Sequence, residues 1–158
     1  MSISTKHIEI VPFTEEYADR FTTLNTAWLQ KYFVVEPVDR QMLANPKEFF
    51  IDQGGLIFFA KLEGIVAGTF ALLRKSAEVY ELSKMAVEEK YQGLNIGNAM
   101  LEFCIRKARE MKLAKIILYS STKLQPAIHL YTKYGFTEVP VDSTIYKRSD
   151  IKMELEIN

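Results

Sequence analysis

One segment of the chain, residues 79–136, joins a strand, a glycine-containing turn and a long helix in immediate succession. The residue pattern predicts the strand over residues 79–87, the turn over residues 92–97 and the helix from Asn95 to about Lys112. A small-residue turn of this kind directs free backbone N–H groups and the positive end of the helix dipole toward one point. The segment therefore predicts a site for a phosphate or diphosphate group.

The helix after the turn is predicted to be amphipathic. Its apolar face consists of Ile96, Met100, Phe103, Cys104, Ala108 and Met111. A short apolar run at 116–118 then predicts a strand over residues 114–120 that is covered on both faces. Pro126 suits the first turn of a further helix, and Gly135 suits the position just beyond its end.

The rest of the chain predicts a mixed α/β fold on one central sheet. Thr14 is a plausible N-cap for a first helix, and Glu63-Gly64 indicates a hairpin turn. Further strands are predicted at 7–13, 56–62, 65–74 and 151–157, with a short helix at 39–44. The strand before the glycine-containing turn is part of a β-rich run over 77–87. With 158 residues and no linker or repeat, residues 1–158 are expected to form a single domain.

Composition excludes several classes of function. Twenty basic and 20 acidic side chains cancel, so nucleic acid and membrane surfaces are not expected partners. Cys104 is the only cysteine, and His7 and His129 lie far apart, so we expect no metal site. The first residues lack the apolar segment of a signal peptide, and we expect a cytoplasmic protein.

Two motifs in this order resemble the GNAT superfamily of acetyl-CoA-dependent N-acetyltransferases. The turn is similar to the family's motif A, Gln/Arg-x-x-Gly-x-Gly/Ala, and residues 131–136 are similar to its Tyr-x-x-x-Gly-Phe helix end. Asn95 stands where the family usually has glycine, but asparagine tolerates a left-handed backbone. The resemblance implies a mixed sheet that is mostly antiparallel, with a splayed parallel pair and about four flanking helices.

The resemblance also implies that acetyl-CoA is the co-substrate. The diphosphate is expected on the turn at residues 92–97 and at the start of the helix that follows. The pantetheine arm is expected to pair with the end of the strand at residues 79–87. The end of the strand at 114–120 and the helix after it are expected on the other side of the arm. The implied cofactor-binding residues are Met85, Ala86, Val87, Gln92, Gly93, Leu94, Asn95, Ile96, Gly97, Asn98, Ser121 and Ala127.

Amine acetylation requires removal of a proton, stabilisation of the thioester oxygen and departure of the thiolate. Glu81 matches the general base of some family members, with a solvent-facing or ion-paired glutamate as the alternative. A backbone N–H near Ala86 is the expected oxygen donor. Tyr131 matches the family's general acid, with a packing role as the alternative. Cys104 is expected in the core, which argues against a covalent enzyme intermediate.

The acceptor site is expected between residues 28–40 and 139–147, where Tyr32, Phe33 and Glu36 form a candidate wall for a cationic amine. Equally, the two aromatic residues can be core and Glu36 solvated. We expect direct transfer of acetyl to a primary amine of a small-molecule or amino-acid-like acceptor. The alternatives are a protein lysine or N-terminal acetyltransferase, a non-catalytic acyl-CoA sensor, or a binder of another phosphorylated ligand such as a nucleotide. A homodimer is possible.

Overall fold

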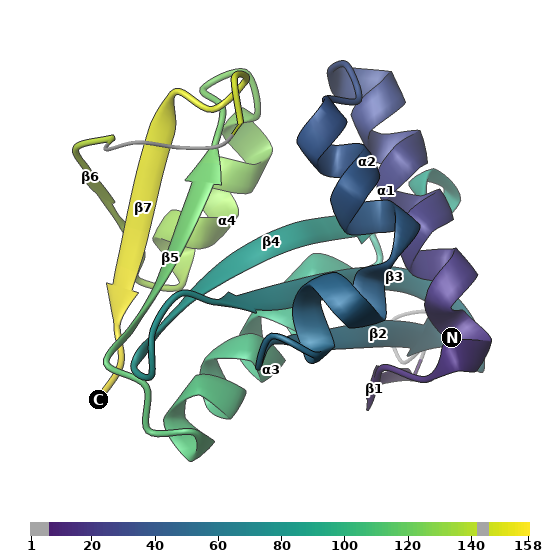
Figure 1. The fold of residues 1–158 in the computed structure, drawn as a ribbon, viewed down its shortest axis with the longest axis horizontal. Helices are drawn as coiled ribbons and strands as arrows, with labels where there is room; N and C mark the ends of the chain where they lie inside the picture. The colour runs from purple at the N-terminus through teal and green to yellow at the C-terminus, as the bar shows by residue number, and fades with distance from the viewer. Residues whose placement is uncertain (1–6, 142–145) are drawn as a thin grey trace, which may run out of the picture.

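The computed structural model describes residues 7–141 and 146–158, and these form one seven-stranded sheet with helices on both faces (Figure 1). The strand order is β1-β2-β3-β4-β5-β7-β6. The strands are β1 (Ile8–Pro12), β2 (Leu56–Leu62), β3 (Ile65–Arg74), β4 (Val79–Val87), β5 (Lys115–Ser120), β6 (Thr137–Val139) and β7 (Ile151–Glu156). The helices are α1 (Ala18–Tyr32), α2 (Pro37–Ala44), α3 (Ile96–Glu110) and α4 (Gln125–Lys133).

The sheet confirms the predicted mixed topology. Within the described residues, β4 and β5 are its one parallel pair, and every other neighbouring pair is antiparallel. The predicted hairpin between β2 and β3 is also present. Glu63 and Gly64 have φ values of 49° and 84°, the positive pair that a tight two-residue hairpin turn requires.

Three local features differ from the sequence prediction. Thr14 makes no side-chain capping hydrogen bond, and a 3₁₀ turn at Glu15–Tyr17 precedes α1. A π-helical turn forms at Lys47–Ile51, and the short strand β6 follows α4. β6 is only 3 residues long and pairs with β7 at the edge of the sheet, so its own sequence carries little periodic signal.

Two apolar cores cover the two faces of the sheet. Residues of α3 and α4 pack on one face, and residues of α1 and α2 pack on the other (Figure 1). Phe58 and Phe59 are neighbours in β2 and point into different cores, as strand alternation requires. On α3, the predicted apolar residues Met100, Cys104 and Ala108 are fully buried. Within the described residues, no helix is long and apolar enough to span a membrane.

The parallel pair β4–β5 separates after a short contact. Its register runs only from Val79 opposite Lys115 to Glu81 opposite Ile117, although both strands continue further. On its other edge β4 carries a bulge, because Ser83 pairs with Ala71 and Ala86 pairs with Thr69 across a register shift. Lys84 lies in this bulge with a φ of 55°, and a bulge of this kind bends a strand and redirects its side chains.

Candidate active site

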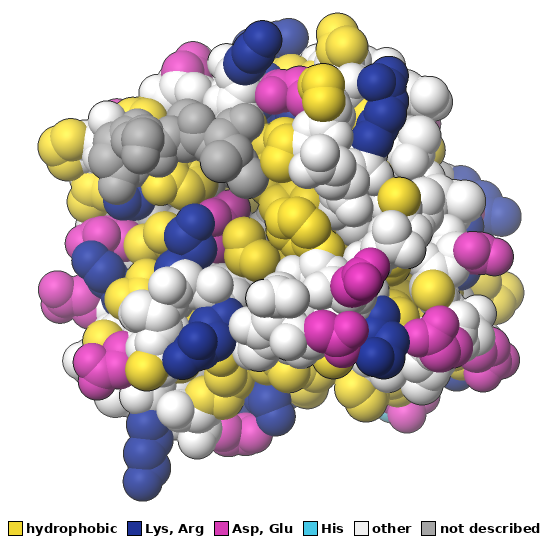
Figure 2. Space-filling model, viewed as in Figure 1, with side chains coloured by type: hydrophobic (Ala, Val, Ile, Leu, Met, Phe, Trp, Pro, Cys, Tyr) yellow, Lys and Arg dark blue, Asp and Glu magenta, His cyan; other side chains and the backbone are white. Residues whose placement is uncertain are grey.

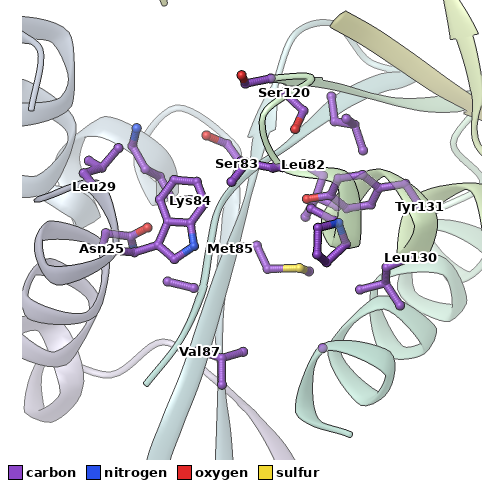
Figure 3. Close-up of a pocket in the computed structure, with 18 of the residues that line it drawn as sticks. Asn25, Leu29, Leu82, Ser83, Lys84, Met85, Val87, Ser120, Leu130 and Tyr131 are labelled. Atoms are coloured by element: carbon purple, nitrogen blue, oxygen red, sulfur yellow. The ribbon is translucent and has the colours of Figure 1, made fainter. Parts of the chain in front are cut away.

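A cavity of about 510 Å³ opens where β4 and β5 diverge. Its walls come from α1, the second half of β4, the start of α3, the end of β5, α4 and residues 146–149. Hydrophobic side chains gather in the hollow at the middle of the face that Figure 2 shows. The bulge in β4 divides its side chains, since Lys84 points toward α1 whereas Met85 points toward Tyr131 and Leu130 of α4 (Figure 3).

The start of α3 has the features of an anion site. Asn95 is the N-cap residue with a left-handed φ of 71°, which bears out the expectation that asparagine can replace glycine there. Gly93 also has a positive φ of 83° and no atom within 4 Å of the position where a Cβ would lie. The first helical hydrogen bond runs from the N–H of Ala99 to Asn95, so the N–H groups before it have no partner within the helix. No acidic residue lies in this first turn.

The cavity brings together most of the residues that the sequence assigned to the coenzyme. Leu94 is the exception, since it does not line the cavity and its side chain is exposed. The assigned residues that line it are Met85, Ala86, Val87, Gln92, Gly93, Asn95, Ile96, Gly97, Asn98, Ser121 and Ala127. A chain of backbone N–H groups at one end and an open strand edge along the side fit an elongated molecule with a diphosphate.

Glu81 lies at the point where β4 and β5 part. It lines the cavity and is only 2% exposed, so it is not the solvent-facing strand residue that the sequence left open. Lys75 Nζ lies 3.7 Å from Glu81 Oε1 and forms an ion pair with it. Burial raises the pKa of Glu81 above its ordinary value, and the positive charges of Lys75 and Lys84 oppose this shift. A carboxylate with a raised pKa is a better proton acceptor than an ordinary glutamate.

Tyr131 lies on α4, on the side of the cavity toward which Met85 points (Figure 3). Its ring packs against Phe136 with the centroids 5.9 Å apart, so the packing alternative is also realised. Burial raises the pKa of Tyr131 to about 12, which keeps the hydroxyl protonated at neutral pH. No hydrogen bond within the described residues involves this hydroxyl, and Tyr131 lines the cavity, so the hydroxyl is available to a bound molecule.

The acceptor wall differs from the expected one. Phe33 lines the cavity, but Tyr32 and Glu36 do not. Tyr32 packs on Trp28, with the ring centroids 5.4 Å apart. Glu36 closes the capping box of α2 and accepts hydrogen bonds from the backbone N–H of Lys147 and from Arg148 Nη1, at 3.0 and 3.1 Å. Of the expected second wall, residues 142–145 lie outside the described residues.

A buried cluster of charges lies behind this part of the cavity. Lys84 Nζ is 2.6 Å from Asp39 Oδ1, and Arg148 donates to both oxygens of the same carboxylate at 2.8 and 2.9 Å. Burial opposes ionisation of the fully buried Asp39, but Arg148 and Lys84 outweigh it and hold its pKa below the ordinary value. Sequence reasoning missed Arg148, because no local pattern brings residue 148 to residue 39.

The fold and the cavity agree with the comparisons to known proteins. The model of the acetyltransferase (GNAT) family matches residues 12–136. The chain belongs to this family. The match confirms the resemblance drawn from the two motifs and identifies the chain as an acyltransferase. A comparison with curated protein sequences gives no significant match.

Solved GNAT structures share the fold over nearly the whole chain. An acetyltransferase of the GNAT family from Staphylococcus aureus Mu50 is 21% identical, with a TM-score of 0.85 over 96% of this chain and 100% of its own. A putative acetyltransferase from Salmonella typhimurium, solved with acetyl-CoA, is 18% identical, with a TM-score of 0.75 over 96% and 94%. The PaiA N-acetyltransferase of Thermoplasma acidophilum, in complex with coenzyme A, is 16% identical, with a TM-score of 0.77 over 95% and 99%.

Proposed function

We propose that this GNAT protein transfers an acetyl group from acetyl-CoA to a primary amine of a small-molecule or amino-acid-like acceptor. The observation that carries the proposal is one continuous cavity, which runs from the N-terminus of α3 to Glu81 and Tyr131 at the divergence of β4 and β5. A coenzyme anchored by its diphosphate at α3 extends along β4 toward these two side chains.

Acetyl-CoA is the co-substrate that this cavity fits. The N–H groups from Gln92 to Asn98 bind its diphosphate, and the strand edge at Met85 and Val87 pairs with the pantetheine amides. Ser121 and Ala127 line the other side of the arm. The two neighbours solved with acetyl-CoA and with coenzyme A support this choice of ligand.

The transfer proceeds by direct attack. Glu81, directly or through a water molecule, accepts a proton from the acceptor ammonium, and the free amine nitrogen attacks the thioester carbon. A backbone N–H near Ala86 donates to the oxygen that gains negative charge. The carbon–sulfur bond then breaks and Tyr131 gives its proton to the departing thiolate. The attacking nitrogen releases its second proton as the amide forms, and this proton restores the Tyr131 hydroxyl, so that the one net proton of the reaction is the one taken by Glu81 and passed to solvent.

An acetyl-enzyme intermediate on the cysteine is not part of this proposal. Cys104 is fully buried on α3 and is not among the cavity-lining residues. Burial raises its pKa to about 12, so the thiolate that a nucleophile needs is scarce at neutral pH. Acetyl transfer in a ternary complex requires no such group.

The test is release of free coenzyme A from acetyl-CoA in the presence of a panel of amines. We expect turnover with at least one small amine and a strong loss of turnover in Tyr131→Phe, about 100-fold, with unchanged acetyl-CoA affinity. Tyr17→Phe is the matched control, since its hydroxyl contacts Lys61 away from the cavity. Tight acetyl-CoA binding without release for any amine would instead indicate a sensor, and unchanged turnover in Tyr131→Phe would remove the acid role.

A further inference from the structure

One edge of the Arg148 guanidinium group is hydrogen-bonded to acidic side chains, and an adjacent edge is not. Nη1 donates to Asp39 Oδ2 and Glu36 Oε2 at 2.8 and 3.1 Å, and Nη2 donates to Asp39 Oδ1 at 2.9 Å. These bonds use the Nη1–Nη2 end of the group. The adjacent edge, formed by Nε and the second N–H of Nη2, has no acceptor among residues 7–141 and 146–158.

Two aromatic rings fix the plane of this group. The guanidinium carbon lies 4.6 Å from the ring centroid of Tyr146 and 5.8 Å from that of Phe33. All three residues line the cavity, and the Arg148 side chain retains 16% exposure there. Because the side chain is already immobilised, binding an anion at its open edge costs little additional rotamer entropy.

The charges on the cavity wall favour an anionic group at this place. Among the described residues, the charged side chains of the lining are Glu81, Lys84 and Arg148. Lys84 is only 3% exposed and is paired with Asp39, so the cationic group that the wall presents on the side of α1 is the open edge of Arg148. The carboxylate at Glu81 suits an amine, and the Arg148 edge suits a group of opposite charge on the same molecule.

We infer that the acceptor is an amine that also carries a carboxylate, and that the open edge of Arg148 binds this carboxylate through two parallel hydrogen bonds. A planar carboxylate matches the spacing of Nε and Nη2, which gives a charge-assisted pair at a cavity wall that is largely shielded from water. The inference rests on the proposed acetyl transfer and narrows its acceptor class. Phe33 and Trp28 add apolar surface to the same cavity.

The experiment compares kcat/KM for matched acceptors, each an amino acid and its carboxamide, in the wild type and in Arg148→Lys. The lysine keeps a positive charge opposite Asp39 but lacks the planar fork. We expect the wild type to prefer the acid by about tenfold or more, and Arg148→Lys to lose most of this preference through a higher KM for the acid. The readout is the ratio of acid to carboxamide within each enzyme, which cancels any general change in activity that the substitution causes.

Lys123→Met is the control variant. Its Nζ lies 4.8 Å from the Phe33 ring, but Lys123 does not line the cavity, so the acid preference should not change. Two results would overturn the inference and leave the proposed acetyl transfer unaffected. One is equal kcat/KM for the acid and the carboxamide in the wild type, and the other is an undiminished preference for the acid in a folded Arg148→Lys. If Arg148→Lys does not fold, the ratio of kcat/KM for the acid and the carboxamide in the wild type is the test. Acetyl-CoA binding with no release for any amine would overturn both proposals.

Discussion

Glu81 illustrates how a fold alters the chemistry of a residue. A glutamate with an ordinary pKa near 4.3 is a poor base for an amine, whose pKa is about 10. At the divergence of β4 and β5, burial raises the pKa of Glu81 although Lys75 and Lys84 are close. Because the folded state binds this proton more tightly than the unfolded state, Glu81 lowers stability as the pH rises from its unfolded pKa through its folded pKa.

Glu81→Gln is predicted to lower kcat about 10²–10⁴-fold, the usual contribution of a general base. In the wild type, kcat should fall as the pH drops below the raised pKa of Glu81. In Glu81→Gln, this decrease at low pH should be absent. The measurement is kcat against pH. Glu154→Gln is the matched control, because Glu154 is a strand glutamate that pairs with Lys115 away from the cavity. If the decrease of kcat at low pH persists in Glu81→Gln, another group is the base.

Asp39 is the residue on which the buried charge cluster depends. It is fully buried and contacts Lys84 and Arg148, so an amide at this position leaves two buried cations opposite a neutral group. We predict that Asp39→Asn lowers the free energy of unfolding by about 3 kcal/mol at pH 7, measured by urea denaturation. Asp52→Asn breaks the exposed pair with Lys47 and should change stability little.

The pH dependence of this contribution follows from the lowered pKa of Asp39. Its stabilisation is fully present above the unfolded pKa, about 4, and is lost as the pH falls through the lower folded pKa. The stability difference between the wild type and Asp39→Asn should therefore be constant from about pH 5 to 7 and shrink below about pH 4. A difference that is already absent at pH 6 would contradict the ion-pair role.

At the scale of elements, the turn before α3 and the bulge in β4 create the cavity. Asn95 starts α3 from a left-handed conformation. The N–H groups before Ala99 have no partner within the helix, as in any first turn, and are available to a ligand. The bulge at Lys84 coincides with the end of the β4–β5 pairing, and the Lys84–Asp39 ion pair ties it to α2. Both elements contain a left-handed residue, and at Lys84 the ion pair with Asp39 holds this conformation in place.

Gly97→Glu tests the anion site at α3. A Cβ at residue 97 would lie 3.3 Å from Leu130 Cδ2, so every larger residue meets some resistance there, and only glutamate adds a negative charge. We predict that Gly97→Glu weakens acetyl-CoA binding about tenfold more than the isosteric Gly97→Gln, measured by calorimetry. If the two variants bind acetyl-CoA equally well, the diphosphate does not bind at the N-terminus of α3.

At the scale of the whole molecule, the cavity lies where the pairing between β4 and β5 is interrupted. Both faces of the sheet are covered by packed cores, but β4 and β5 separate between them, and their freed backbone groups need a partner. In the complex that we propose, the coenzyme arm supplies such a partner by pairing with β4. The net formal charge of zero gives no overall electrostatic steering, so recognition depends on this local geometry.

Acetyl-CoA should therefore stabilise the whole fold. At a concentration 100 times its Kd, a ligand that binds only the folded state adds about 2.7 kcal/mol, which corresponds to about 5–10 °C in Tm for a chain of this length. We predict this rise in a thermal-shift measurement with acetyl-CoA and a much smaller one with ATP or NAD at equal concentration. A larger rise with a nucleotide would favour the alternative phosphorylated ligand.

The sequence by itself determined most of the helices and strands and the residues that line the proposed coenzyme end of the cavity. Helical and strand periodicity, the Glu63-Gly64 turn and the two motifs are local patterns, and the backbone geometry of a turn and helix start depends on neighbouring residues. For this reason, nearly all of the residues assigned to the coenzyme line the cavity, and Leu94, whose side chain points outward, does not.

Only the tertiary structure decided which side chains lie at the proposed acceptor end of the cavity. Glu36 faces Arg148 rather than the cavity, and Arg148 reaches Asp39 across 109 residues of sequence. Such contacts depend on where the segment before β7 folds back against α2, which no local pattern specifies. The charge that a pocket presents is set by which partner of each ion pair lies on the inside, and that is a property of the packed fold.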